Sequence, residues 1–120
     1  MELLGVDHVA INVDDVDAAI GFYTSMLGLS VRTDRPDFGF GGAWLDAGGQ
    51  QVHLVQAPVA PALGQHFSLL VTDLDGLVGE LRAEGVGVSD AMDNGQDRQC
   101  FTSDPAGNTI ELHERGTAGR

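Results

Sequence analysis

Residues 108–114, NTIELHE, decide the fold. Apolar Ile110 and Leu112 alternate with polar residues, which is the period-2 pattern of a strand with one buried face. The apolar face must pack on a core, so a carboxylate and an imidazole stand two residues apart on the other face. The same pattern of residue types occurs 58 positions earlier, where His53 takes the place of Glu111. The chain therefore contains an internal repeat.

The repeat extends over both halves of the chain. Each half opens with an alternating strand, followed by an amphipathic helix with an acidic first turn. The predicted strands lie near 7–13, 29–34, 40–46 and 50–56, and then near 66–71, 86–90, 97–103 and 108–114. The sequence predicts an α+β fold of two βαβββ modules in one domain (1–120), with helices on one side of the sheet. The modules are 4–56 and 65–115, and 57–64 is a linker with two prolines.

Charge and composition narrow the function classes. The chain has no lysine and a formal net charge of −12, which excludes a Schiff-base lysine and disfavours nucleic acid and anionic membranes as partners. The acidic surface could attract a cationic ligand, or simply be a solvated surface. The single cysteine, Cys100, rules out an internal disulfide and is typical of a reducing compartment. No spanning segment or leader is expected, so the prediction is a cytoplasmic protein.

Four polar residues occupy matched places in the repeat. His8 and His66 lie on the first strands, and His53 and Glu111 lie on the last strands, all opposite the predicted core face. Each pair is separated by 58 residues, so the four side chains would meet if the modules were related by a pseudo-twofold axis. Three imidazoles and one carboxylate suit a divalent transition metal such as Zn, Ni, Mn or Fe. His113 could orient Glu111 by a hydrogen bond, although a solvated strand-end residue is the simpler interpretation.

The chain resembles the vicinal oxygen chelate superfamily, which includes glyoxalase I, bleomycin resistance proteins and extradiol dioxygenases. The resemblance rests on DHVAINVDDVDAAIGFYTSMLGLSV (7–31), GAWLDAGGQQVHLV (42–55), HFSLLVTDLDGLVGELRAEGVGVS (66–89) and FTSDPAGNTIELHE (101–114). It implies metal ligation by His8, His53, His66 and Glu111, in a concave mixed sheet with the helices on its outer face. It also implies open metal positions where two neighbouring substrate oxygens chelate.

The resemblance leaves three functions open. The leading one is a metal-dependent lyase or isomerase, with the ion as Lewis acid and Glu111 as both ligand and candidate proton shuttle. Glyoxalase I has a carboxylate where this chain has His53, which weakens a close match to that enzyme. The second function is a binding protein that sequesters an antibiotic, as bleomycin resistance proteins do. An extradiol-type dioxygenase is third.

Substrate contacts and assembly are predicted from the same pattern. If Phe101 faces the core, Arg98 and Cys100 face the site, and the repeat adds Phe40 and Trp44. An aromatic wall with an arginine suits a small planar or apolar substrate that bears an anionic group. Plain core packing of the aromatic residues is an equal alternative. Small members of the resembled family often form homodimers, so the metal site could lie within one chain or across two.

Overall fold

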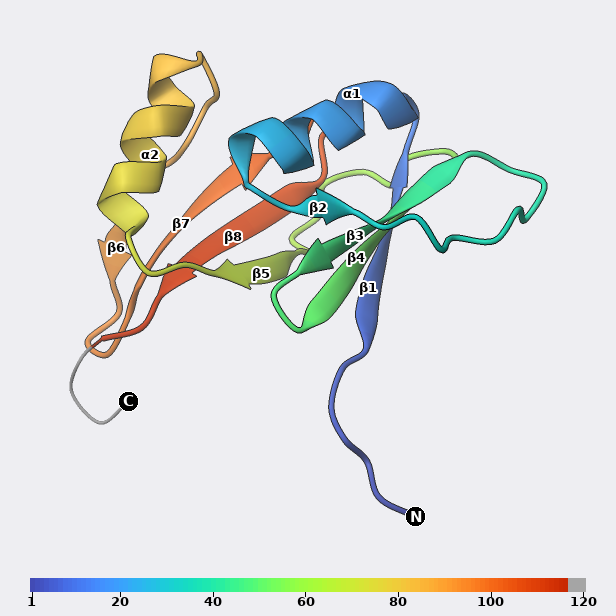
Figure 1. Cartoon of the computed structure of the whole chain (residues 1–120). Coiled ribbons are helices and arrows are strands. Elements are labelled where there is room, and N and C mark those ends of the chain that lie inside the picture. Colours follow the sequence, from blue (N-terminus) through green and yellow to red (C-terminus); the bar gives the residue numbers. More distant parts are fainter. Residues whose placement is uncertain (117–120) are drawn as a thin grey trace. The chain divides into compact units, whose positions relative to one another are not determined.

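The structure is a computed structural model of the chain, and it describes residues 1–116. By internal contacts the chain divides into two compact units between Ala60 and Pro61, inside the predicted linker. Both units have the predicted element order, strand, helix and three strands (Figure 1). The prediction of two βαβββ modules is confirmed.

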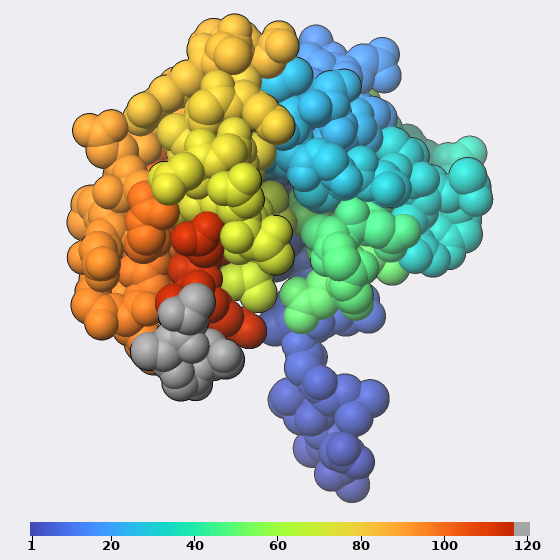
Figure 2. Space-filling view, turned by 60° about the vertical axis from the view of Figure 1, so that its left-hand side comes forward, coloured from blue at the N-terminus to red at the C-terminus, as the bar shows by residue number. Residues whose placement is uncertain are grey.

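The first unit contains one four-stranded sheet with a helical segment packed on two of its strands. Its elements are β1 (His8–Val13), α1 (Val16–Gly21), η1 (Phe22–Met26), β2 (Ser30–Val31), β3 (Gly42–Ala47) and β4 (Gln50–Gln56). The strand order is β1-β4-β3-β2, in which β1 runs parallel to β4 and the other pairs are antiparallel. Residues 1–7 extend from this unit as an exposed arm (blue in Figure 2).

The helix of the first unit starts where the acidic residues predict. The side chain of Asp15 caps α1 by accepting a hydrogen bond from the Ala18 backbone N–H at 3.0 Å. The predicted apolar stripe is then buried at Ala19 and Tyr23. The segment continues past Gly21 as the π-helical turn η1 and stops at Gly28, whose φ of 77° suits glycine.

The second unit repeats this arrangement. Its elements are β5 (Phe67–Leu70), α2 (Leu74–Ala83), β6 (Met92–Asp93), β7 (Arg98–Ser103) and β8 (Thr109–Glu114). The strand order is β5-β8-β7-β6, with β5 parallel to β8. The side chain of Asp73 caps α2 by accepting a hydrogen bond from the Gly76 N–H. This cap corresponds to the one that Asp15 forms with Ala18 in the first unit.

The prediction of a strand near 86–90 is wrong. Only Val88 makes a bridge there, to Thr102, and the edge strand is the two-residue β6 further along the chain. Ser89 N–H still donates to the Phe101 carbonyl on β7, but the carbonyls of Gly87 and Val88 accept from side chains. Thr102 Oγ1 donates to the Gly87 carbonyl, and a nitrogen of Arg82 donates to the Val88 carbonyl. A segment tied down in this way cannot also form a regular edge pairing.

The two hairpins that end the units differ in length by one residue. Asp46 on β3 pairs with Gln51 five positions later, whereas Ser103 on β7 pairs with Thr109 six positions later. Corresponding residues of β4 and β8 therefore differ by 58 in residue number, whereas corresponding residues of β3 and β7 differ by 57. Because side chains alternate along a strand, this single residue exchanges the two faces of β7 relative to the prediction.

Each unit has its own buried apolar residues. In the first unit they are Val13, Ala19, Phe22, Tyr23, Ala43, Leu45, Val52 and Leu54, and in the second they are Leu74, Val78, Leu81, Cys100, Ile110 and Leu112. Most of these residues come from the helix stripes and from the predicted core faces of the strands; Cys100 is the exception, because the prediction put it on the site face of its strand. Within residues 1–116, no helix is long and apolar enough to cross a bilayer.

Candidate functional site

The first unit brings His8 and His53 into contact. They lie on β1 and β4, which are parallel neighbours, and their ring centroids are 3.9 Å apart with planes 15° from parallel. Trp44 stands opposite His53 on β3, and its ring stacks on the other side at 4.5 Å. The two histidines and the tryptophan form a continuous row of stacked rings.

The hydrogen bonds of these histidines define where lone pairs lie. His8 Nδ1 is 2.8 Å from a carboxylate oxygen of Asp7, so Nδ1 carries the proton and a neutral ring keeps a lone pair on Nε2. His53 Nε2 is 2.7 Å from Gln51 Oε1, so Nε2 donates and the lone pair of the neutral ring lies on Nδ1. Desolvation by burial and then the nearby His8 lower the pKa of His53 below its ordinary value. His53 is therefore a neutral imidazole at neutral pH.

The second unit brings His66 and Glu111 together in the matching place. Ser68 on β5 pairs with Glu111 on the parallel strand β8, and His66 Nε2 lies 3.2 Å from Glu111 Oε1. His66 Nδ1 donates to the Gly64 carbonyl at 2.9 Å, which leaves the lone pair of a neutral ring on Nε2. Two acceptors would then face each other at 3.2 Å. That geometry requires either a proton on Nε2 or a cation bound by both groups.

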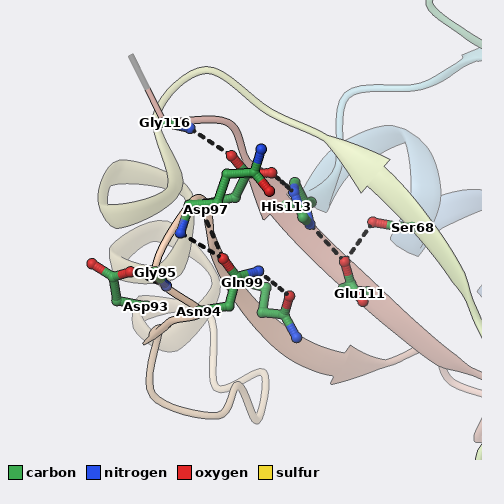
Figure 3. Close-up of polar contacts among 10 residues, drawn as sticks. Ser68, Asp93, Asn94, Gly95, Asp97, Gln99, Glu111, His113 and Gly116 are labelled. Atoms are coloured by element: carbon green, nitrogen blue, oxygen red, sulfur yellow. Dashed lines mark hydrogen bonds and ion pairs between the residues drawn. The ribbon is translucent and has the colours of Figure 1, made fainter. Parts of the chain in front are cut away.

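Three side chains lie against the Glu111 carboxylate, and Figure 3 shows two of them, Ser68 and His113. Ser68 Oγ donates to Oε2 at 3.0 Å and His113 Nδ1 donates to the same oxygen at 2.8 Å, while Oε1 faces His66. Burial raises the pKa of Glu111, but hydrogen bonds from His113, Ser68 and His66 outweigh it and hold the pKa below its ordinary value. Glu111 is therefore an ionised, well-oriented carboxylate at neutral pH.

His113 links Glu111 to a second, buried carboxylate. Its Nε2 is 2.8 Å from Asp97 Oδ2, and Asp97 is only 4% exposed. Hydrogen bonds to Asp97 and then to Glu111 raise the pKa of His113, and each ring nitrogen faces a carboxylate oxygen at 2.8 Å. The interpretation of His113 as a solvated strand-end residue is wrong. It bridges two carboxylates.

Asp97 is itself held by the backbone around it. Its Oδ1 accepts from the Gly116 N–H at 2.9 Å, and its own N–H donates to Asn94 Oδ1 at 2.8 Å (Figure 3). The turn before β7 thus fixes Asp97, Asp97 fixes the ring of His113, and that ring fixes one oxygen of Glu111. The sequence does not single out Asp97, the first residue of the strand predicted near 97–103, because its contacts come from the turn that precedes β7.

The predicted face of β7 is corrected by the structure. Phe101 was expected to face the core, but it pairs with Glu111, and its ring meets His66 edge-on at 5.3 Å. Cys100 is instead 1% exposed and pairs with the buried Leu112. Burial raises the pKa of the Cys100 thiol, as expected for a structural cysteine.

Arg98 also lies away from the predicted site. Two of its guanidinium nitrogens donate to the carboxylate of Asp75 in the first turn of α2, at 2.8 and 3.1 Å. Glu114 lies 3.6 Å away. The one-residue difference in hairpin length explains why Cys100 and Arg98 both lie away from the predicted site. It shifts β7 by one position against β8, so that Phe101 takes the place that the repeat assigned to an adjacent residue of the strand.

Of the other two predicted substrate contacts, Trp44 stacks on His53, and Phe40 lines the same pocket. They line a pocket of about 420 Å³ in the first unit together with Asp7, His8, Ala10, Arg35, Phe38, Gln51, His53, Leu54 and Val55. Arg35 and Phe38 were not predicted, because they lie in the irregular segment between β2 and β3. Gln51 and Ser68 could have been found from the sequence, since each stands two residues from a histidine on the same strand face.

The second unit has a pocket of its own. It measures about 410 Å³ and is lined by Ser68, Leu70, Asp97, Glu111, His113 and Arg115. Across residues 1–116, no group of three or more histidine, cysteine or acidic side chains is placed to hold a metal ion. Each unit contributes one pair of the predicted ligands.

Comparisons with known proteins agree with the fold. Residues 5–112 match the family model of the Glyoxalase/Bleomycin resistance protein/Dioxygenase superfamily. The chain is 29% identical to lactoylglutathione lyase GLX1 of Arabidopsis thaliana over 124 aligned positions, which cover 91% of this chain and 44% of the relative. The chain thus spans less than half the length of that relative.

Two solved structures are similar over nearly the whole chain. A glyoxalase family protein from Bacillus anthracis has a TM-score of 0.88 and 27% identity, with 97% of this chain and 98% of that chain covered. TnmS3, an antibiotic binding protein from Streptomyces sp. CB03234, has a TM-score of 0.79 and 25% identity, with 97% and 99% covered.

Proposed function

Because the chain belongs to the glyoxalase, bleomycin resistance protein and dioxygenase superfamily, we propose that it is a metal-dependent lyase or isomerase of a small molecule with vicinal oxygens. The observation that carries the proposal is the facing of His66 Nε2 and Glu111 Oε1 at 3.2 Å, with the other ring nitrogen of His66 already committed to a carbonyl. Such an arrangement is typical of a histidine prepared as a metal ligand.

The proposed ligands are His8, His53, His66 and Glu111, which bind one divalent ion of the Zn, Ni, Mn or Fe type. The donor set fits such an ion, because His8 and His53 also have one ring nitrogen committed to an oxygen acceptor and the other free to coordinate. When bound, the ion supplies Lewis-acid polarisation of a substrate oxygen.

The protein's own residues supply the proton chemistry in this proposal. Glu111 is ionised at neutral pH and can accept a proton from a carbon next to a carbonyl group of the substrate. Ser68 and His113 hold one of its oxygens and leave the other toward His66. Orientation of a general base in this way lowers the entropic cost of proton transfer.

Metal content tests the proposal directly. Protein produced without a histidine tag is loaded with each of the four ions, desalted, and analysed for bound metal per chain. We expect one ion per chain, lost in His66→Ala and in Glu111→Gln and retained in Glu80→Gln, an exposed carboxylate on α2. Two ions per chain, with one surviving each single-unit variant, would contradict a single site with four ligands.

The reaction class is tested by a screen with metal-loaded protein. Adducts of 2-oxoaldehydes with thiols, chiral acyl thioesters and catechols each present two neighbouring oxygens to the ion. We expect lyase or isomerase turnover with one of the first two classes, and none in Glu111→Gln. Oxygen consumption with a catechol would favour the dioxygenase alternative instead.

The second candidate is ligand sequestration without chemistry. It is supported by the likeness to TnmS3, which binds an antibiotic, and by the aromatic pocket of the first unit. Tight binding of a small molecule by protein that takes up no metal and shows no turnover would favour it. We also propose a homodimer, which multi-angle light scattering tests by mass against the 12.6 kDa of one chain.

A further inference from the structure

The pocket of the first unit is built around a row of five rings. The order is His8, His53, Trp44, Phe38 and Phe40, with successive centroids 3.9, 4.5, 6.1 and 5.7 Å apart. Phe38 and Phe40 are 48% and 49% exposed, so they are not core residues. The row presents flat apolar surface to a pocket of about 420 Å³, a volume suited to a drug-sized ligand.

A guanidinium group stands at the phenylalanine end of this row. The Cζ atom of Arg35 lies 5.2 Å from the ring centroid of Phe38 and 5.5 Å from that of Phe40. One of its nitrogens donates to the Phe40 carbonyl at 3.0 Å. A Cβ at Gly42 would lie 2.9 Å from that nitrogen, so the glycine leaves room for the guanidinium.

Arg35 differs from most other arginines of the chain. Arg32, Arg82 and Arg98 each pair with at least one aspartate, at 2.7–3.0 Å. No carboxylate among residues 1–116 pairs with Arg35, although acidic residues outnumber basic ones by 18 to 6. Within the described part of the chain, Asp7 is the only carboxylate that lines the pocket, and it is hydrogen-bonded to His8 at the opposite end of the row.

From these contacts we infer that the pocket binds a planar aromatic ligand with an anionic group, such as an aryl carboxylate. The ring of the ligand packs on Trp44 and Phe38, and the anion accepts hydrogen bonds from Arg35. A planar guanidinium matches a carboxylate with two parallel hydrogen bonds, and its fixed position reduces the ordering cost of binding. The inference rests on the proposed small-molecule function and names the ligand class for the same site.

Trp44 makes the test specific to this pocket, because it is the only tryptophan of the chain. Its indole N–H gives a single resonance in the ¹H–¹⁵N spectrum, and binding is followed by the shift of that signal. Three naphthalene probes that differ in charge are titrated: naphthalene-2-carboxylate, 2-naphthylmethanol and 2-naphthylmethylammonium. EDTA is present throughout, so that the result does not depend on metal.

We expect the carboxylate to bind at least about tenfold more tightly than the alcohol, and the ammonium to bind most weakly. Arg35→Gln should remove the preference for the carboxylate, and Phe38→Leu should weaken all three probes. Arg82→Gln changes the net charge equally at a site on α2 and should leave the three affinities unchanged. Thermal unfolding of each variant verifies that it is folded, and Arg35→Lys, which keeps the charge without the planar fork, should retain part of the preference.

Three outcomes would overturn the inference: no shift of the indole signal with any probe at millimolar concentration, tighter binding of the ammonium, or an unchanged preference in folded Arg35→Gln. These outcomes are separate from the metal analysis. Aryl carboxylate binding by protein that takes up no metal would remove the enzyme proposal alone. Stoichiometric metal with no probe binding would remove this inference alone.

Discussion

His113 has a carboxylate within 2.8 Å of each of its ring nitrogens, one from Asp97 and one from Glu111. A ring in that position is stabilised in its charged form, which is why its pKa is raised. Because the folded-state pKa lies above the unfolded value, the contribution to stability is complete below the unfolded pKa of about 6.5. It is lost as the pH rises through the folded-state pKa.

This linkage predicts a pH-dependent effect of His113→Gln. At pH 6 the substitution should lower the free energy of unfolding by about 1.5–3 kcal/mol, the range for hydrogen bonds to charged groups. At pH 9 the loss should be smaller, because the stabilisation decreases as the pH rises through the raised pKa of the ring. Urea unfolding at the two pH values measures both numbers, and Asp97→Asn should show the same trend. An effect that grows with pH would contradict the charge assignment.

The burial of Cys100 predicts an unreactive thiol. The side chain is 1% exposed, and its thiolate, which is the reactive form, is disfavoured by burial. The folded protein should therefore react with Ellman's reagent at least about a hundredfold more slowly than the urea-unfolded protein, if reaction requires opening of the second unit. A fast reaction in native buffer would contradict this burial and indicate that Cys100 lies on the accessible face of β7.

At the residue scale, the sequence predicts the four candidate ligands better than the residues around them that complete the site. His8, His53, His66 and Glu111 follow from periodicity and repeat position, and the structure brings them together in two pairs. Arg35 lies in an irregular segment, where no period assigns a face, and Asp97 lies in the turn just before β7 although the predicted strand near 97–103 includes it. Their contacts depend on how the turns fold, and a strand pattern holds no information about that.

Among the elements, the turn between β7 and β8 decides which face of β7 lies beside Glu111. Asp104 is 4% exposed, and its Oδ1 accepts from the backbone N–H groups of Ala106 and Asn108 at 3.0 and 2.9 Å. Its Oδ2 accepts from the side-chain amide of Asn108 at 3.0 Å. One carboxylate therefore organises the five residues that set the register of the hairpin.

Removal of that carboxylate should destabilise the second unit. Asp104→Ala leaves buried N–H groups without an acceptor, and we expect the free energy of unfolding to fall by about 1–3 kcal/mol. Asp104→Asn keeps one acceptor oxygen and should cost less. Chemical denaturation of the two variants beside the wild type gives the comparison, and an alanine variant as stable as the asparagine variant would sink this account of the turn.

Element order and helix starts could be predicted because they depend on local signals: alternation, an apolar stripe and a capping aspartate. The absence of a regular strand near 86–90 could not be predicted, because two carbonyls of that segment accept from the side chains of Thr102 and Arg82, which no alternation reveals. The prediction of which residues of β7 face the core failed for a different reason. An ungapped repeat hides the extra residue in the turn, and a shift of one position inverts a strand.

For the molecule as a whole, the dominant physical feature is its charge. Eighteen acidic residues against six basic ones give a formal net charge of −12 on 120 residues. Mutual repulsion of this kind destabilises a compact state, and added salt screens it. Salt also weakens the exposed arginine–aspartate pairs, but such pairs contribute little individually.

The melting temperature should therefore rise with salt. Between 10 and 500 mM NaCl we expect an increase of a few degrees, on the order of 1 kcal/mol in the free energy of unfolding. Calorimetry in sucrose at matched osmolality separates charge screening from preferential exclusion. A melting temperature that falls with NaCl would mean that the ion pairs outweigh the repulsion.

The unequal hairpins have a consequence for descent from a duplicated gene. An inserted codon in a turn changes no residue of the strand before it. It nevertheless exchanges the two faces of that strand, so that the side chains that were buried point to the site and the others to the core. No single substitution has this effect. After such an event Trp44 and Phe101 are the corresponding positions of the two copies, although an ungapped alignment matches Trp44 with Thr102. One copy could thereby exchange the residues that face its pocket in a single mutational step, while the other kept its ancestral set.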